Sequence, residues 1–180
     1  MCVNPLKVWI TISIKEDNMF KEMRRKEKEM SEDRLNEILK TGEYGVLSVL
    51  DSTGYPYGVP VNYVFVEGKL YVHCAKAGAK LEAILKNPKV SFNIVATHGL
   101  IAERFTSFYE SVTLFGQAKL IEGEETVPPL KAFIDKYSSD YREGGYKYAE
   151  GSFKETMIIE VTPAHITGKS SNMPKGSESC

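Results

Sequence analysis

The chain has 180 residues, 42% of them hydrophobic, and a formal net charge of -1 at pH 7. This length suits one domain, and the composition can supply an ordinary globular core. The near-neutral charge gives no electrostatic reason to expect a nucleic-acid or acidic-membrane partner. The three cysteines are odd in number and far apart, so they favour neither a disulfide framework nor a zinc knuckle, and they fit a cytoplasmic location.

The N-terminal residues predict neither a membrane anchor nor a signal peptide. The apolar run 8–14, VWITISI, is much shorter than the roughly 20 residues that a transmembrane helix needs. No signal-peptide cleavage pattern follows it, and the next stretch is densely charged. We expect a flexible N-terminal extension over 1–21, one domain over 22–170 and a flexible tail over 171–180.

The periodicity of apolar residues predicts a mainly β domain with about three helices. Helices are expected over 31–40, 80–86 and 124–138, and strands over 44–51, 55–67, 69–74, 89–95, 110–123, 156–163 and 165–170. The stretches 97–108 and 139–152 show no clear period and are predicted to be loops. Tight turns join the early strands, so six or seven mostly antiparallel strands around one core indicate a small closed or partly open barrel.

Local signals add detail to three of these elements. Ser31 is expected to cap the first helix and Gly42 to stop it. In the second helix, Leu81, Ile84 and Leu85 are expected to face the core. Gly116 lies on the apolar face of its strand and indicates a kink or a bulge.

The stretch VHCAKAGAKL, residues 72–81, places a glycine and a lysine between a strand and a helix. Backbone N–H groups at a helix start are free, and the helix dipole adds partial positive charge there. With Lys80 and His73 nearby, the stretch is a candidate anion site of phosphate size, although the nucleotide-binding GxxxxGK[ST] pattern is absent. A plain strand-to-helix turn with a surface lysine is the alternative.

The stretch GYPYGVPVNY, residues 54–63, holds two prolines, two glycines and three tyrosines inside an expected strand. Because proline cannot donate to a strand ladder, such a strand is locally unpaired, and its free backbone groups can meet a flat ring with polar edges. An irregular edge strand without a ligand is the alternative. Residues 109–116, YESVTLFG, alternate between a polar and an apolar face, as an ordinary strand also does.

Several other kinds of site are not supported. The chain has no HExxH, CxxC, GxSxG or GxGxxG pattern, so we expect no metal centre, serine hydrolase or Rossmann site. His73 and Cys74 are neighbours on a strand and point to opposite faces, which disfavours a Cys–His pair. His73 is the best candidate for acid–base chemistry, because a histidine pKa lies near neutrality.

Six stretches occur together in an order typical of one family. MRRKEKEMS, YGVLSV, GYPYGVPVNY, LYVHCAKAGAKLEAILKNPKVSF, YESVTLFGQA and ITGKS resemble the pyridoxamine 5′-phosphate oxidase-related split-barrel proteins, most closely the 5-nitroimidazole resistance (Nim-type) group. The resemblance covers roughly residues 22–170. It implies an α+β, mainly β fold, a six-to-seven-stranded antiparallel split β-barrel, and an FMN-binding homodimer with its flavin sites at the subunit interface.

The resemblance also implies roles for particular residues. Lys80 and His73, with the backbone of Gly78 and Ala79, would lie near the FMN phosphate. Val59, Pro60, Val61, Asn62 and Tyr63 would run along the flavin ring, Ser111 and Val112 would come from the neighbouring strand, and Ala75 belongs to the same cofactor-binding set. The family often has a larger polar residue where Ala79 stands, so one phosphate contact is lost here.

The function implied is that of an FMN-dependent oxidoreductase acting on a small molecule. Nitroimidazoles and other nitroaromatics are candidate substrates, NAD(P)H is a candidate electron donor, and His73 is the candidate catalytic residue. Two alternatives stay open: a non-enzymatic flavin-binding or redox-sensing protein, and a split barrel that binds another ligand such as haem or pyridoxal phosphate. Substrate specificity would lie in the stretches 97–108 and 139–152.

Overall fold

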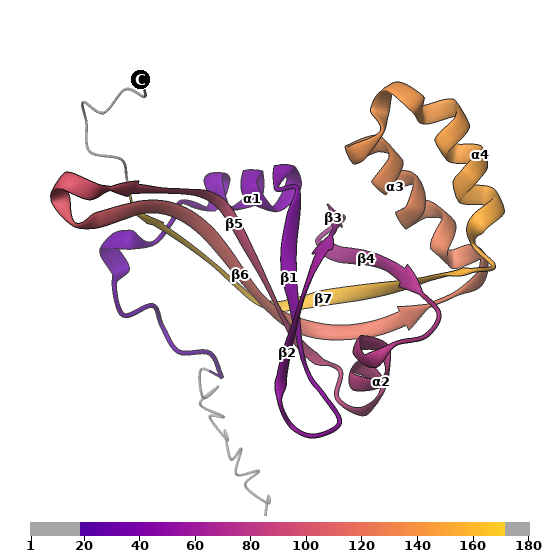
Figure 1. Cartoon of the computed structure of the whole chain (residues 1–180), viewed down its shortest axis with the longest axis horizontal. Coiled ribbons are helices and arrows are strands. Elements are labelled where there is room, and N and C mark those ends of the chain that lie inside the picture. Colours follow the sequence, from indigo (N-terminus) through magenta and orange to yellow (C-terminus); the bar gives the residue numbers. More distant parts are fainter. Residues whose placement is uncertain (1–18, 172–180) are drawn as a thin grey trace, which may run out of the picture.

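The structure is a computed structural model that describes residues 19–171 (Figure 1). These residues form seven strands: β1 Tyr44–Leu50, β2 Pro56–Asn62, β3 Val64–Val66, β4 Lys69–Ala75, β5 Lys89–Ile101, β6 Thr106–Ile121 and β7 Thr156–Ser171. They also form four α-helices: α1 Glu32–Thr41, α2 Ala79–Lys86, α3 Val127–Tyr137 and α4 Arg142–Ser152. None of these helices is both long and apolar enough to cross a membrane. The predicted extension over 1–18 and tail over 172–180 lie outside the described residues.

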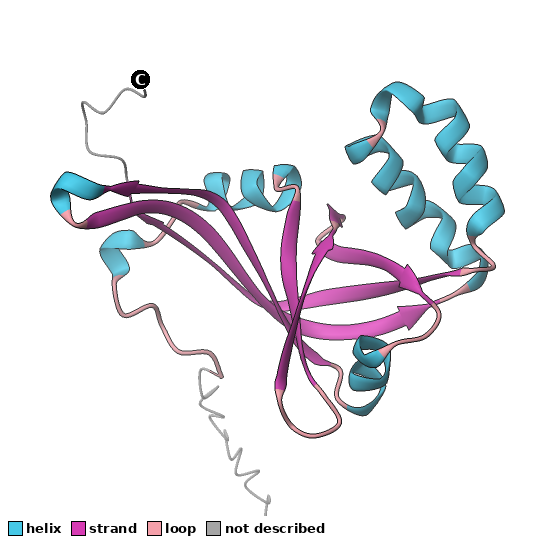
Figure 2. Cartoon of the chain, viewed as in Figure 1, coloured by secondary structure: helices cyan, strands magenta, loops and turns pink. Residues whose placement is uncertain are grey.

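All seven strands belong to one antiparallel sheet with the order β2-β1-β5-β6-β7-β4-β3 (Figure 2). The strands β2 and β3 are the two edges of this sheet, yet Tyr63 alone separates them in the chain. The sheet must therefore curl until its edges meet at that residue, and β2 contacts β4 across the gap. This confirms the predicted antiparallel split barrel, with four helices instead of about three.

Alternate strand residues fill the interior of the barrel, as a period of two requires. The largest fully buried side chains of the core include Tyr63, Phe92, Leu47, Leu114 and Ile159. On α1, the core face carries Ile38 and Leu39, and the backbone N–H of Arg34 donates to the Ser31 hydroxyl at 3.4 Å, which confirms the predicted cap. On α2, the prediction for Leu85 is wrong. That side chain is 74% exposed, because the buried face of the helix is turned toward Ala83.

The stretch 97–108 was predicted to be a loop because its sequence shows no clear period. That prediction is wrong. The strands β5 and β6 continue pairing to Ile101 and Thr106, and Figure 1 shows them projecting from the barrel as a two-stranded ribbon. A register shift between Val95 and Thr97 explains the error. An extra residue in one strand moves the following side chains to the other face, and the alternation on which the prediction depends is lost.

The stretch 139–152 is not a loop either. After a short turn it forms α4, which packs antiparallel on α3 as a helical hairpin (Figure 1). Glycine lowers helix propensity by about 1 kcal/mol, but tertiary packing overrides such preferences. Gly145 lets the two helices approach, because a Cβ there would lie 2.5 Å from Cγ2 of Ile134. Ion pairs from Arg142 to Asp135 and from Lys131 to Glu150 also join the hairpin.

The last two predicted strands are one continuous strand, β7, which pairs with β6 along nearly its whole length. The pairing shifts register between Phe115 and Gly116, so the predicted irregularity at Gly116 is confirmed. A side chain at that glycine would place its Cβ 2.4 Å from the backbone oxygen of Thr162. At the other end of the chain, Phe20 stacks on His165 with ring centroids 4.8 Å apart, so packing begins before residue 22.

Candidate functional site

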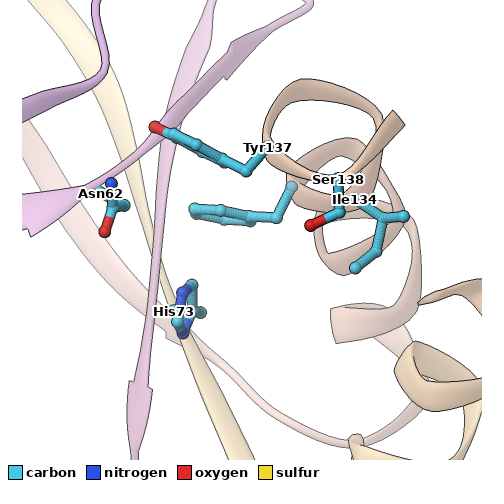
Figure 3. A pocket seen from close by; sticks show the side chains of 6 residues that line it. Asn62, His73, Ile134, Tyr137 and Ser138 are labelled. Atoms are coloured by element: carbon cyan, nitrogen blue, oxygen red, sulfur yellow. The ribbon is translucent and has the colours of Figure 1, made fainter. Parts of the chain in front are cut away.

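A cavity of about 260 Å³ lies between the strands β2 and β4 on one side and helix α3 on the other (Figure 3). The strands contribute Asn62 and His73. The helix and the residue after it contribute Phe133, Ile134, Tyr137 and Ser138. Two residues of the predicted cofactor-binding set therefore meet four residues that lie far along the chain.

His73 faces this cavity from β4. The edge of its ring packs against Phe133, with centroids 4.7 Å apart and ring planes at 86°. Partial burial lowers the pKa of the imidazole below its ordinary value of 6.5, because charge is disfavoured away from water. His73 is therefore neutral at neutral pH, with one nitrogen that donates and one that accepts a hydrogen bond. That protonation state suits the exchange of a proton with a ligand in the cavity.

The junction between β2 and β3 is held by α3. The backbone N–H of Tyr63 donates to the Tyr137 hydroxyl at 3.1 Å, and that hydroxyl lies 2.7 Å from the backbone oxygen of Tyr63 and 2.6 Å from that of Glu43. The Lys136 ammonium donates to the same Tyr63 oxygen at 3.0 Å. The sequence predicted free backbone groups here, but at Tyr63 they are already paired with α3.

The Tyr63 side chain is not part of a ligand-facing surface. It is completely buried, its hydroxyl donates to the backbone oxygen of Ile38 at 3.1 Å, and its ring packs edge-on against Phe92. Burial raises the pKa of this phenol well above its ordinary value of 10.0. Tyr63 therefore serves the core, and its predicted place along a flavin ring is wrong for the side chain.

The rest of the predicted ring-binding stretch lies on an open edge of the sheet. Val59, Pro60, Val61 and Asn62 belong to β2, which pairs with β1 alone among the described strands. Only one side of β2 is therefore used in the ladder, so β2 is an edge strand, although its pairing with β1 runs from Pro56 to Asn62 without a register shift. Backbone groups on the other side are free to bind a ligand or a second chain. The role of these residues toward a flavin stays a prediction.

The predicted anion site is built around the start of α2. Gly78 has φ of +138°, which favours glycine, and a Cβ there would meet no atom within 4 Å, so the space in front of the helix is open. Its backbone oxygen accepts from the N–H groups of Leu81 and Glu82 at 3.0 and 3.3 Å. The N–H groups of Ala79 and Lys80 come before those and, as in any first helical turn, have no intrahelical acceptor.

Lys80 is not among the residues that line the cavity with His73. The charge of Lys80 acts on the Cys74 thiol, where it partly offsets the rise in pKa that burial causes. Side chains of Cys74 and His73 point to opposite faces of β4, so His73 belongs to the cavity under α3 and Lys80 to the start of α2. Ala75, the last residue of β4, is exposed between the two.

Ser111 and Val112 are not part of the same site within one chain. Both lie in β6, and the strands β5 and β1 stand between β6 and β2. Val112 is completely buried in the core, and Ser111 is half-buried beside Val95 and Lys169. The side chain of Val112 presents no surface to a ligand, because the core covers it.

A sequence profile decides the family. The profile of the pyridoxamine 5′-phosphate oxidase family matches residues 31–170, from the start of α1 to the end of β7. The chain belongs to this family. No curated protein matches the sequence.

Several solved structures share the fold of this chain. One is a conserved hypothetical protein from Mycobacterium tuberculosis, with a TM-score of 0.72, 15% identity, and coverage of 87% of this chain and 98% of that chain. A second is a candidate 5-nitroimidazole antibiotic resistance protein from Bacteroides thetaiotaomicron. Its TM-score is 0.62 at 23% identity, and the match covers 78% of this chain and 84% of that chain. A third is an FAD- and haem-binding protein from Mycobacterium smegmatis. Its TM-score is 0.60 at 19% identity, and the match covers 82% of this chain and 75% of that chain.

Sequence reasoning missed the α3 wall of the cavity. The helical stripe of residues 124–138 does predict that Phe133, Ile134 and Tyr137 point inward. It cannot show that they point at His73, because that contact depends on how the helical hairpin packs onto the barrel. Ser138 follows the helix and carries no sequence signal of its own.

Proposed function

We propose that this protein binds FMN and is an oxidoreductase acting on a small molecule. The observation that carries the proposal is the open start of α2, where Gly78, Ala79 and Lys80 present backbone N–H groups and a positive charge. A phosphate group binds well at such a place, because both the helix dipole and the lysine favour a negative charge. Membership of the pyridoxamine 5′-phosphate oxidase family and the likeness to an FAD- and haem-binding protein support a flavin as its carrier.

The residues present fit FMN in two parts. The phosphate would be held by the Lys80 ammonium and by the backbone N–H groups of Ala79 and Lys80. The flavin ring would lie along the free edge of β2, from Val59 to Asn62. When bound, FMN would supply the transfer of electrons. His73 would hold or release a proton at its imidazole, and buried Phe133 would exclude water beside it.

We include a homodimer in this proposal. Ser111 is far from β2 in the sheet order, so it can join the same site only if a second subunit brings its β6 to the first. Three large apolar side chains on or near the projecting ribbon support an interface: Val95, Leu100 and Phe105 are 57%, 76% and 98% exposed. Exposed apolar groups gathered on one projection are typical of a surface that a partner covers.

The substrate class is the finer part of the proposal. We propose a nitroaromatic acceptor with NAD(P)H as electron donor, and the likeness to a candidate 5-nitroimidazole resistance protein supports this choice. Steady-state oxidation of NAD(P)H with a nitroaromatic acceptor tests it. Bound flavin that is never reduced by either nicotinamide would contradict the enzyme and leave a flavin-binding protein.

The cofactor is tested by the spectrum of the purified protein, with the released chromophore identified by mass. Lys80→Ala should weaken FMN binding roughly ten- to a hundred-fold, because a charged group that binds phosphate contributes about 1.5–3 kcal/mol. The thermal stability of the flavin-free protein should hardly change, since a lone surface charge adds little to folding. Lys86→Ala, in the last turn of the same helix, is the matched control. Equal weakening by both variants, or release of haem alone, would refute the phosphate site.

A further inference from the structure

A groove crosses the outer face of the strands β1, β5, β6 and β7, on the side away from the core. It is made of two adjoining hollows of about 260 Å³ each, and both are lined by Lys89, Val90 and Phe115. One hollow extends to Leu50 on β1, and the other extends to Ala164 on β7. The groove therefore runs over four neighbouring strands of the sheet.

The strand register explains the shape of this groove. Ser48, Ser91 and Phe115 lie opposite one another on three neighbouring strands. Phe92, the residue after Ser91, is completely buried in the core, so alternation turns the three side chains outward. The two serines are small and half-buried, whereas Phe115 is 38% exposed and Leu50, on the same face of β1, is 43% exposed. Two large apolar side chains therefore border a floor of small ones.

The described chain begins at the β7 end of the groove. Met19 and Phe20 line the hollow that reaches β7. The Phe20 ring stacks on His165 with centroids 4.8 Å apart, and its centre lies 5.4 Å from that of the Phe115 ring. Residues upstream of Met19 therefore start at the groove, and this tether gives them a high effective concentration for docking there.

The stretch 8–14, VWITISI, has the pattern of a strand with one apolar face. Every second position carries a β-branched apolar residue, namely Val8, Ile10, Ile12 and Ile14. The positions between them carry Trp9, Thr11 and Ser13. Such strict alternation is typical of an extended segment that buries one face against another surface. The next four residues, KEDN, are all polar or charged and suit a linker in water.

This segment is long enough to cover the groove. The four residues 15–18 span at most about 14 Å when fully extended. The seven residues 8–14 span roughly 23 Å as a strand, at about 3.3 Å per residue. Neighbouring strands are about 4.8 Å apart, so three spacings separate β7 from β1 by about 14 Å. The stretch 8–14 can therefore lie across all four strands while Phe20 keeps its place on His165.

We propose that residues 8–14 dock in the groove of their own chain. The β-branched face of the segment packs against Leu50 and Phe115, and Thr11 and Ser13 point to water. The driving force is the removal of apolar surface from water on both sides of the contact. The segment of a second copy is disfavoured as the occupant, because only the chain's own segment is held beside the groove by Phe20. This docking does not depend on FMN.

Thiol labelling of cysteine substitutions in the full chain tests the docking. The chain carries either Ile12→Cys on the apolar face of the segment or Thr11→Cys on the opposite face. Peptide mass spectrometry follows the reaction of the introduced thiol with iodoacetamide, and each rate is divided by the rate in urea. Ile12→Cys should react at least tenfold more slowly than Thr11→Cys, because docking shields its thiol from the reagent.

A charge in the groove should remove this difference. With Leu50→Asp added, Ile12→Cys should react as fast as Thr11→Cys, because an unpaired carboxylate opposes the burial of an apolar face. Leu85→Asp adds the same charge to the exposed face of α2 and is the matched control, which should keep the tenfold difference. Circular dichroism checks that each variant is folded. Ser91→Gln fills the floor of the groove without a charge and replaces Leu50→Asp if that variant does not fold.

Three results would overturn the proposal. Equal rates for Ile12→Cys and Thr11→Cys in the otherwise unaltered chain would mean that the apolar face of the segment is not covered. A tenfold difference that survives a folded groove variant would place the segment elsewhere, such as along the free edge of β2. The chain with both Ile12→Cys and Leu50→Asp, refolded with an excess of unaltered chain, should still react fast. A slow reaction there would assign the groove to the segment of a second copy.

Discussion

Lys136 occupies a place where a positive charge is unfavourable. Its ammonium lies 4.0 Å from the centre of the Tyr63 ring and 5.2 Å from that of Tyr137, and no ion pair to it is found within residues 19–171. Burial lowers its pKa from 10.5 to about 8. The aromatic faces compensate in part, because they attract a cation.

This lysine predicts a pH dependence of stability. Between its folded pKa of about 8 and its ordinary 10.5, the unfolded chain holds the proton more tightly, so the free energy of unfolding should rise with pH. Compared with Lys136→Met, the wild type should gain about 1 kcal/mol between about pH 7 and about pH 9.5, a discounted value because the group is only half-buried. Urea unfolding measures it, with Lys86→Met as the control. Parallel pH curves for wild type and Lys136→Met would contradict this prediction.

Residues of the candidate site differ in how far the sequence could place them. The positions of Gly78 and Lys80 could be predicted from the local sequence, because it shows a glycine directly before a helix and a lysine in the first helical turn. Asn62 and His73 were predicted from the resemblance, but as neighbours of a flavin and its phosphate, not of α3. Tyr63 was misplaced because a tyrosine in an irregular strand carries no sign that its hydroxyl reaches the Ile38 oxygen in the core.

The helix α1 illustrates a correct boundary with an unexpected cause. Gly42 does follow the helix, but its φ is -57°, a value open to any residue, so no left-handed turn requires glycine there. The requirement is space. A Cβ would lie 2.6 Å from the Tyr63 hydroxyl and 3.0 Å from both the Ile38 oxygen and Cγ2 of Ile94. The absence of a side chain lets α1 settle against the buried tyrosine that joins β2 to β3.

Gly42→Ala should therefore destabilise the protein by about 1–3 kcal/mol, the usual cost of overpacking a well-filled core. Gly144→Ala is the matched control, because a Cβ at that position of α4 would meet nothing within 4 Å. It should leave stability unchanged or raise it by about 0.5–1 kcal/mol through better helix propensity. Chemical unfolding of both variants measures the contrast, and a similar result for the two would mean that the space around Gly42 is not limiting.

At the scale of elements, the sequence predicts those whose pattern is unbroken. The strands of the barrel were expected from their alternating apolar residues, although β2 and β3 were predicted as one strand and β7 was predicted as two. The ribbon beyond Val95 was missed, since a bulge reverses the alternation, and α4 was missed, since its glycines argue locally against a helix. In both cases the cause is tertiary: β6 extends the pairing of β5, and Ile134 fills the space that Gly145 leaves.

For the molecule as a whole, we predict a dimer in solution. Light scattering should give a mass about twice the 20.2 kDa of one chain. If FMN binds between subunits, dilution that separates them should also release the flavin, because association and binding are linked. The Lys80→Ala variant should remain dimeric, since Lys80 is proposed to act on the phosphate alone. A monomer that binds FMN tightly would contradict the interface site.

The place of β7 has a consequence for how the chain is made. This strand, the last within residues 19–171, lies between β6 and β4, and its Ile158, Ile159 and Val161 are completely buried. During synthesis from the N-terminus, β4 and β6 therefore remain with an unpaired edge and an uncovered apolar face until β7 has left the ribosome. Those unpaired edges are the part of the nascent protein most exposed to incorrect strand pairing. A chaperone that protects them would need to stay bound until about residue 171 has emerged from the ribosome.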